Sequence, residues 1–152
     1  MGRRTKAREC AVQMLYQKEI TGAAMDEVAA SFWEVRSTVT ETREMAERLA
    51  RGAQRQVLEV DAAIVAAVKH WRIERLSVVD KSVLRIGTYE LMYERHTPAA
   101  VVLDEAVDIA KRFGEGDSPA FVNGVLDAIC REVRGSELSS RRDAKGVADH
   151  DG

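Results

Sequence analysis

The chain has 152 residues, of which 45% are hydrophobic and 32% charged, and its formal net charge is −2 at pH 7. This length suits one domain with its own core and excludes a large two-domain enzyme, and the composition excludes disorder throughout. The mildly acidic balance excludes a protein that binds nucleic acid over its whole surface, so any such contact has to be local.

The first predicted element is a helix with a basic start. Its apolar spacing predicts a helix from about residue 5 to residue 20, ending at Gly22. The first eight residues contain no acidic side chain and four basic ones, Arg3, Arg4, Lys6 and Arg8. The helix dipole opposes each cation in a first turn by about 0.3 to 1 kcal/mol. Two explanations stay open: an anionic ligand such as an RNA backbone, or a solvated chain end.

Four further helices are predicted in the middle of the chain. One covers residues 25–36, and the next begins near Thr38, because Thr38 and Glu41 have the spacing of a capping box. Its apolar pattern continues to residue 71, with a break expected between residues 58 and 61, since one unbroken helix of that length would be unusual. A helix from about residue 79 to residue 95 contains Gly87, whose cost of about 1 kcal/mol relative to alanine predicts close approach of another helix.

The last two predicted helices share one start signal, a capping residue followed by proline. Thr97 with Pro98 begins one, which carries Phe113 inward and stops at Gly114, and Ser118 with Pro119 begins the other. No run of alternating apolar and polar residues has the length and turn signals of a strand. The sequence therefore predicts an all-α fold of about seven helices in one domain, residues 1–134. Residues 135–152 have almost no large apolar side chain and are predicted to form a disordered tail.

Catalytic and metal-binding patterns are missing from the sequence. Cys10 and Cys130 lack metal or redox spacing and are predicted to be packed thiols, and the three histidines have no partner at ligand spacing. There is no glycine-rich phosphate loop, nucleophile elbow or Cys/His pair. We therefore expect a binding protein without metal or cofactor rather than an enzyme. No apolar run approaches the ~20 residues of a membrane helix, and we expect a cytoplasmic protein.

The connection between the last two predicted helices is acidic and contains glycine. It lies within residues 104–129, DEAVDIAKRFGEGDSPAFVNGVLDAI. Asp117 or Ser118 can cap the final helix, and Phe121 lies in its first turn, so capping and core packing explain these residues well. An aromatic side chain that stayed exposed there could instead stack on an unpaired base.

Three segments, taken together and in order, resemble the bacterial NusB family of transcription antitermination factors. They are RRTKARECAVQMLYQ, IERLSVVDKSVLRIGTYELMY and TPAAVVLDEAVDIAKRFGEGDSPAFVNGVLDAI. The resemblance implies two small helical bundles packed across each other, about residues 1–72 and 73–134. It also implies binding of the boxA segment of nascent ribosomal RNA transcripts together with the ribosomal protein NusE, and assembly on RNA polymerase to suppress termination.

Carried over residue by residue, the resemblance implies two binding surfaces. The RNA surface would comprise Arg3, Arg4, Lys6, Arg8, Asp117 and Phe121, with the two segments as neighbours in space. The surface for the protein partner would comprise Tyr16, Glu74, Asp80 and Arg85. The chain departs from the family pattern at Thr5, where arginine is frequent, and at Asp80, where a glutamate is frequent, so these contacts can differ in strength.

Two alternatives compete with an antitermination factor. Some ribosomal RNA cytosine methyltransferases carry a similar helical domain at the amino terminus, but this sequence has no large α/β domain to hold S-adenosylmethionine. The chain could also be a protein-protein scaffold whose basic start is incidental and which self-associates as a homodimer when free. RNA binding across a salt series separates these possibilities.

Overall fold

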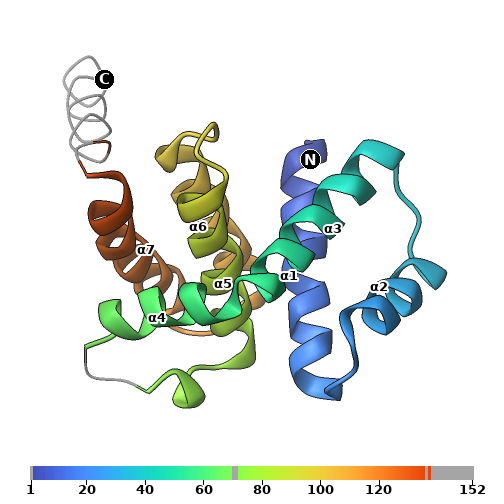
Figure 1. Cartoon of the computed structure of the whole chain (residues 1–152), viewed down its shortest axis with the longest axis horizontal. Helices are drawn as coiled ribbons and strands as arrows, with labels where there is room; N and C mark the ends of the chain where they lie inside the picture. The colour runs from blue at the N-terminus through green and yellow to red at the C-terminus, as the bar shows by residue number, and fades with distance from the viewer. Residues whose placement is uncertain (1, 70–71, 136, 138–152) are drawn as a thin grey trace.

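The computed structural model describes residues 2–69, 72–135 and 137, and this part of the chain contains seven α-helices and no strand (Figure 1). The predicted all-α fold with seven helices is confirmed. In chain order the helices are α1 (Arg3–Thr21), α2 (Met25–Glu34), α3 (Thr40–Arg55), α4 (Val57–Ala67), α5 (Val78–Tyr93), α6 (Ala99–Phe113) and α7 (Ser118–Arg134), with a short 3-10 turn η1 (Ile73–Arg75) before α5. The predicted tail lies outside the described residues, apart from Gly135 and Glu137.

Helix ends follow the sequence signals only in part. Gly22 closes α1 in the left-handed conformation, with φ 72°, and its N–H donates to the Lys18 carbonyl at 2.8 Å. The break between α3 and α4 falls at Gln56, just before the predicted interval. The predicted capping box at Thr38 is wrong, because the residue that precedes α3 is Val39 and no side chain caps the helix.

Both proline-containing helix starts are displaced by one residue. Pro98 itself precedes α6 in an extended conformation, so Thr97 is not the cap. The Ala99 N–H, which has no acceptor inside the helix, donates to Glu137 Oε1 at 2.7 Å. Ser118 is the first residue of α7 and follows Asp117, whose side chain makes no capping hydrogen bond.

Helix α5 is the centre of the fold. It packs against α1, α3, α4, α6 and α7, and its residues are buried almost continuously from Lys81 to Leu91. A Cβ atom on Gly87 would lie 2.8 Å from Leu126 Cδ1 of α7, so glycine permits the close approach that the sequence predicted. The buried apolar side chains form one cluster that draws on all seven helices.

The helices form two groups on either side of α5. Figure 1 shows α1, α2 and α3 at the right and α4, α6 and α7 at the left. Helix α4 packs mainly on α5 and α7, which associates it with the carboxyl-terminal helices although it precedes residue 72. A division into bundles at that residue therefore stays a prediction.

The two cysteines are packed inside this core, as predicted. Cys10 on α1 and Cys130 on α7 are both buried and form no disulfide. Burial raises the pKa of the Cys10 thiol, because the charged thiolate would lose its hydration. No helix within the described part of the chain is long and apolar enough to cross a membrane.

Candidate nucleic-acid interface

The first turn of α1 presents three exposed cations. Arg3, Arg4 and Lys6 all lie at the surface, and the turn contains no acidic residue and no side-chain cap. Arg3 Nη1 lies 3.8 Å from Glu41 Oε2, but both side chains are about 70% exposed, so this ion pair is worth little. Arg4 and Lys6 have no hydrogen-bond or ion-pair partner among the described residues. All three cationic side chains can therefore bind an anionic ligand.

Arg8 does not belong to this exposed group, which corrects the prediction that it meets RNA phosphates. Its side chain is 4% exposed and lies between α1 and α5. The guanidinium donates to both carboxylate oxygens of Glu90, Nε to Oε1 at 2.8 Å and Nη2 to Oε2 at 2.9 Å. Because Nε and Nη2 of Arg8 are already hydrogen-bonded to Glu90 inside the protein, Arg8 stabilises the fold.

The corner between α6 and α7 exposes an acid and two aromatic side chains. Asp117 is exposed and its carboxylate caps nothing, whereas the Ser118 hydroxyl accepts from the Glu115 N–H at 3.3 Å. Phe121 is half-buried, packed on the core cluster. Phe113, which the sequence predicted to point inward, is 42% exposed at the last position of α6. The corner thus offers two aromatic surfaces for stacking.

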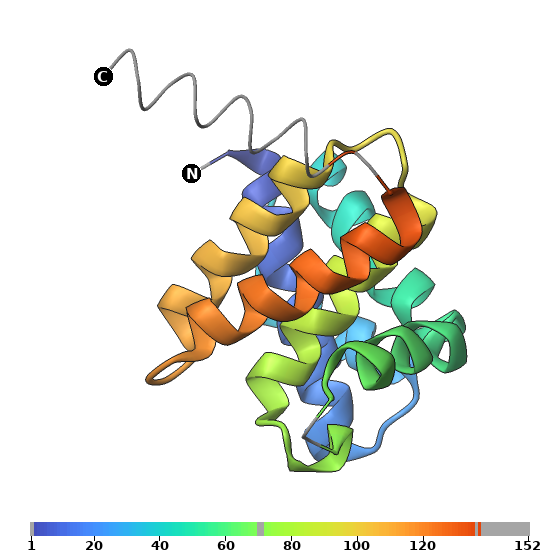
Figure 2. The same ribbon diagram turned by 90° about the vertical axis from the view of Figure 1, so that its left-hand side faces the viewer.

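Helix α6 connects the corner to the basic start of α1. The Thr5 hydroxyl donates to Glu105 Oε1 at 2.8 Å, and Arg112 near the end of α6 forms an ion pair with Glu9. Figure 2 shows the corner at the far end of α6 from the amino terminus. Between Glu105 and the last residue of α6 the helix rises by about 12 Å, so a ligand that touches both segments can run along this part of it. No hydrogen bond or ion pair joins the segments directly in the described part.

The residues predicted for the protein partner lie around the end of α1 and the start of α5. Figure 1 places η1, the start of α5 and the end of α1 at the same end of the molecule. Tyr16 is 42% exposed, Glu74 is exposed on η1, and Asp80 is half-buried in the first turn of α5. The Asp80 N–H donates to the hydroxyl oxygen of Ser77, which caps the start of α5, at 3.0 Å.

Arg85 differs from the other three predicted partner residues because its guanidinium is already engaged. Nε and Nη2 donate to the two Asp61 carboxylate oxygens at 2.9 Å each, and Nη1 donates to Glu19 Oε2 at 3.2 Å. Only 16% of the side chain is exposed. Burial disfavours the charged form, but the hydrogen bonds and charges of Asp61 and Glu19 outweigh it and raise the pKa of Arg85. Arg85 therefore ties α5 to α4 and α1.

No group of three or more histidine, cysteine or carboxylate side chains that could hold a metal ion occurs within residues 2–69 and 72–135. The geometry offers cations, aromatic surfaces and carboxylates for contact with a partner. A family model described as the NusB family matches residues 5–131. The chain belongs to the NusB family. This membership confirms the predicted family and the expectation of an antitermination factor rather than an enzyme.

Relatives and solved structures agree with this assignment over most of the chain. The transcription antitermination protein NusB of Sorangium cellulosum is 44% identical over 133 residues, which cover 88% of this chain and 95% of the relative. A structure of T. maritima NusB superposes with a TM-score of 0.80 at 34% identity, covering 91% of this chain and 98% of that one. A crystal structure of antitermination factors NusB and NusE in complex with dsRNA superposes with a TM-score of 0.78 at 31% identity, covering 87% and 98%.

For a NusB-family chain, sequence reasoning found most of the exposed candidates and missed two features. It missed Phe113, because the residue continues the apolar spacing of α6 although the helix ends before another element covers it. It also missed the internal partner of Arg8, although Glu90 lies beside Leu91 on a helix whose apolar spacing predicted burial. A carboxylate in such a position needs a buried cation, and this was the available signal.

Proposed function

We propose that this NusB-family protein binds boxA RNA of nascent ribosomal RNA transcripts together with the ribosomal protein NusE, and assembles on RNA polymerase to suppress termination. The observation that carries the proposal is the group of exposed cations in the first turn of α1, Arg3, Arg4 and Lys6, which the helix dipole opposes. The similar solved complex of NusB and NusE with dsRNA supports the choice of partners. This role places the protein in the cytoplasm, where such transcripts are made.

The RNA contacts divide into phosphate binding at α1 and base contacts at the α6–α7 corner. Arg3, Arg4 and Lys6 neutralise backbone phosphates, which fixes the position of the RNA and makes its affinity depend on salt. Asp117 accepts hydrogen bonds from base edges, and the exposed surface of Phe121 stacks on an unpaired base. Arg8 makes no direct contact in this proposal.

The protein partner docks beside the end of α1 and the start of α5. Tyr16 supplies a large exposed ring, and Glu74 and Asp80 supply negative charge that suits a cationic partner. Arg85 acts as a positioning residue that holds α1, α4 and α5 together beneath this surface. A homodimer of the free protein stays a prediction, which sedimentation of the chain alone would test.

The RNA surface is tested by removing its three cations at once. Arg3→Ala, Arg4→Ala and Lys6→Ala in one variant should weaken binding of single-stranded boxA RNA. They should also lower the slope of log affinity against log salt by about 2, because each lost phosphate contact on a single strand contributes about 0.7. The matched control combines Arg55→Ala, Lys69→Ala and Arg131→Ala, which remove the same charge from exposed sites elsewhere. Equal slopes for wild type and the α1 variant would refute this surface.

The partner surface is tested separately by calorimetry with purified NusE. Asp80→Asn removes one charge while keeping the shape of the side chain, and Tyr16→Ala removes the exposed ring; both should weaken NusE binding and leave the helical content unchanged. Glu44→Gln on the exposed face of α3 serves as the charge-matched control for Asp80→Asn. Unchanged affinity in both test variants would place the partner on another surface.

A further inference from the structure

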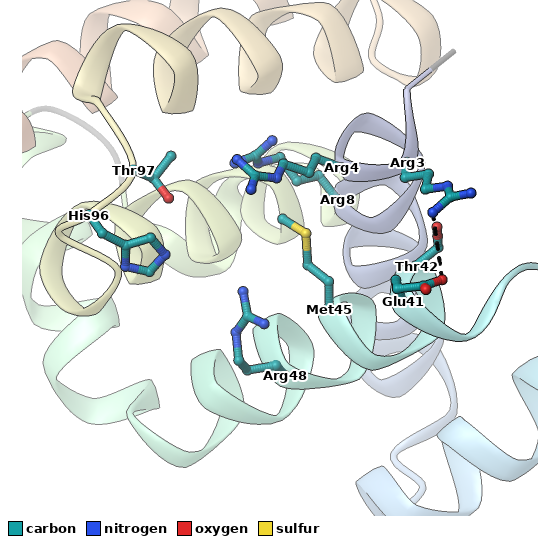
Figure 3. A pocket seen from close by; sticks show the side chains of 9 residues that line it. All are labelled: Arg3, Arg4, Arg8, Glu41, Thr42, Met45, Arg48, His96 and Thr97. Carbon is teal, nitrogen blue, oxygen red and sulfur yellow. Dashed lines mark ion pairs between the residues drawn. The ribbon is translucent and has the colours of Figure 1, made fainter.

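A basic pocket lies beside the first turn of α1, between this helix, α3 and the connection from α5 to α6 (Figure 3). Its volume is about 270 Å³. It is lined by Arg3, Arg4, Arg8, Glu41, Thr42, Met45, Arg48, His96 and Thr97. The sequence patterns that pointed to RNA included neither Arg48 nor His96, and neither residue belongs to the surfaces described above.

Three basic side chains converge on the pocket from three different elements. Figure 3 shows Arg4 of α1, Arg48 of α3 and His96 of the α5–α6 connection pointing into the same space around Met45. Arg4 and His96 have no hydrogen-bond or ion-pair partner in the described part of the chain. Both side chains therefore keep hydrogen-bond donors that a ligand in the pocket can use.

Arg48 keeps unused donors although it has an ion-pair partner. Its Nε donates to Glu94 Oε1 at 2.8 Å, and about half of the side chain stays exposed. A guanidinium has five N–H donors, and no hydrogen bond from Nη1 or Nη2 of Arg48 occurs among the described residues. The bond to Glu94 therefore orients the planar group and leaves its outer edge free for an oxyanion.

The wall opposite α1 is held in place by hydrogen bonds. Arg134 of α7 donates to the Thr97 carbonyl at 2.6 Å and to the Glu94 carbonyl at 3.3 Å, and the Thr97 N–H donates to the Glu94 carbonyl at 3.0 Å. Arg8, paired with Glu90, closes the floor. The donors thus sit on a fixed frame, which reduces the ordering cost of binding an anion.

The charges around the pocket favour an anion even after the internal pairs are subtracted. Glu90 and Glu94 neutralise Arg8 and Arg48, and Glu41 partly offsets Arg3 through their exposed ion pair, which leaves the charge of Arg4 without a counter-ion. A phosphodiester carries one negative charge and accepts several hydrogen bonds, so it matches the single uncompensated positive charge of Arg4. Met45 offers an apolar surface beside the donors, which suits the ribose next to a phosphate.

We propose that this pocket is a subsite for one phosphate group of the RNA backbone, gripped by Arg4, Arg48 and His96. The inference rests on the proposed RNA-binding function and extends the RNA path from the first turn of α1 across to α3. It adds Arg48 and His96 to the residues that contact RNA.

The test measures binding of single-stranded boxA RNA across a salt series for pocket variants. Arg48→Ala should weaken binding several-fold at low salt and lower the slope of log affinity against log salt by about 0.7, the value of one phosphate contact. Arg48→Lys keeps the charge and should retain the slope. The matched control is Arg43→Ala, because Arg43 is also an exposed, ion-paired arginine of α3 but lies outside the pocket. His96→Ala, in an exposed connection, should weaken binding without altering the fold.

A second arm separates RNA phosphate from free phosphate. Inorganic phosphate alone, titrated while the His96 ring signals are followed by NMR, should perturb them weakly, and boxA RNA should perturb them at far lower concentration. If inorganic phosphate binds tightly and the pocket variants leave RNA affinity unchanged, the pocket is a free-anion site and the inference is wrong.

The variants of α1 distinguish this inference from the function on which it rests. If the triple α1 variant weakens RNA binding while Arg48→Ala and His96→Ala match wild type, the pocket inference fails and the proposed function stands. If neither set of variants changes affinity or salt slope, both fail. A weakening by Arg43→Ala equal to that by Arg48→Ala would show a diffuse charge effect and would also overturn the subsite.

Discussion

Arg8 and Glu90 form a bidentate ion pair inside the interface between α1 and α5, with side chains only 4% and 2% exposed. Burial disfavours the charged guanidinium, but the hydrogen bonds and charge of Glu90 outweigh it and raise the pKa of Arg8. The pair fixes the start of α1 on the central helix. The exposed cations of the preceding turn are therefore presented from a rigid base.

Breaking this pair from one side should destabilise the protein strongly. Arg8→Met leaves the Glu90 carboxylate buried without a partner, and we expect the free energy of unfolding to fall by about 3–5 kcal/mol. Arg8→Met combined with Glu90→Leu should recover most of this loss, because no unpaired charge remains. Urea denaturation measures both variants. Arg4→Met, one turn earlier and exposed, should change stability by less than about 0.5 kcal/mol; a cost equal to that of Arg8→Met would contradict the assignment.

Arg134 at the end of α7 should be a second stabilising arginine. Its side chain is 3% exposed and donates to the carbonyls of Glu90, Leu91, Glu94 and Thr97, which lie at the end of α5 and in the connection that follows it. Arg134→Ala should lower the free energy of unfolding by about 3 kcal/mol, because several acceptors lose a charged donor. Arg134→Lys should lower the free energy of unfolding by less than Arg134→Ala but still measurably, since an ammonium group lacks the planar, forked donors of a guanidinium.

Chemical denaturation of the Arg134 variants needs a control on the same helix. Arg131→Ala removes an exposed arginine that pairs with Asp127 one turn away, and such a surface pair is worth at most about 1 kcal/mol. If Arg131→Ala and Arg134→Ala lower the free energy of unfolding by the same amount, the contacts of Arg134 with the carbonyls contribute no more than a surface ion pair.

The positions of the helices could be predicted from the sequence because apolar spacing reports which face is buried. Apolar spacing predicts the helix α5, and Gly87 within it predicts close contact with another helix. The packing of Leu126 of α7 against Gly87 confirms this contact. Caps were harder, since they depend on how the chain enters a helix. At Thr97 the following proline takes the extended entry position itself.

The candidate site could be predicted only where exposure follows from position in the chain. Arg3 and Arg4 lie at the beginning of a helix, where little can cover them. Arg8 has the same side chain one turn later, but its surroundings depend on Glu90, 82 residues further along. The pocket with Arg48 and His96 joins three distant segments, and no local pattern reports such convergence.

Two glycines in helices should respond to alanine in opposite directions. A Cβ atom on Gly52 of α3 would collide with the ring of Tyr89 on α5, so Gly52→Ala should destabilise the protein by about 1–3 kcal/mol despite its better helix propensity. Gly124 of α7 has open space around its Cβ position, and Gly124→Ala should stabilise by up to about 1 kcal/mol. Thermal unfolding measures both. Adding Tyr89→Leu to Gly52→Ala should recover stability if the ring is the obstacle.

The ion pairs of Glu19 should make part of the stability depend on acid pH. The hydrogen bond from Lys81, at 2.8 Å, is the main cause that lowers the pKa of Glu19 below its ordinary value of 4.5, and Arg85 adds to it against the effect of burial. A carboxyl whose pKa is lowered by folding contributes stability above its unfolded pKa. This contribution is lost as the pH falls through the folded value.

Replacing Glu19 by glutamine should therefore have a pH-dependent cost. We expect Glu19→Gln to lower the free energy of unfolding near neutral pH, and the difference from wild type to shrink steadily as the pH falls below about 4.5. Lys81→Met removes the main cause of the lowered pKa, so Glu19→Gln in that background should cost less at neutral pH. Urea titrations between pH 3 and pH 7 measure these differences. A cost of Glu19→Gln that stays constant across this range would show that the carboxylate gains nothing from Lys81 and Arg85 in the folded protein.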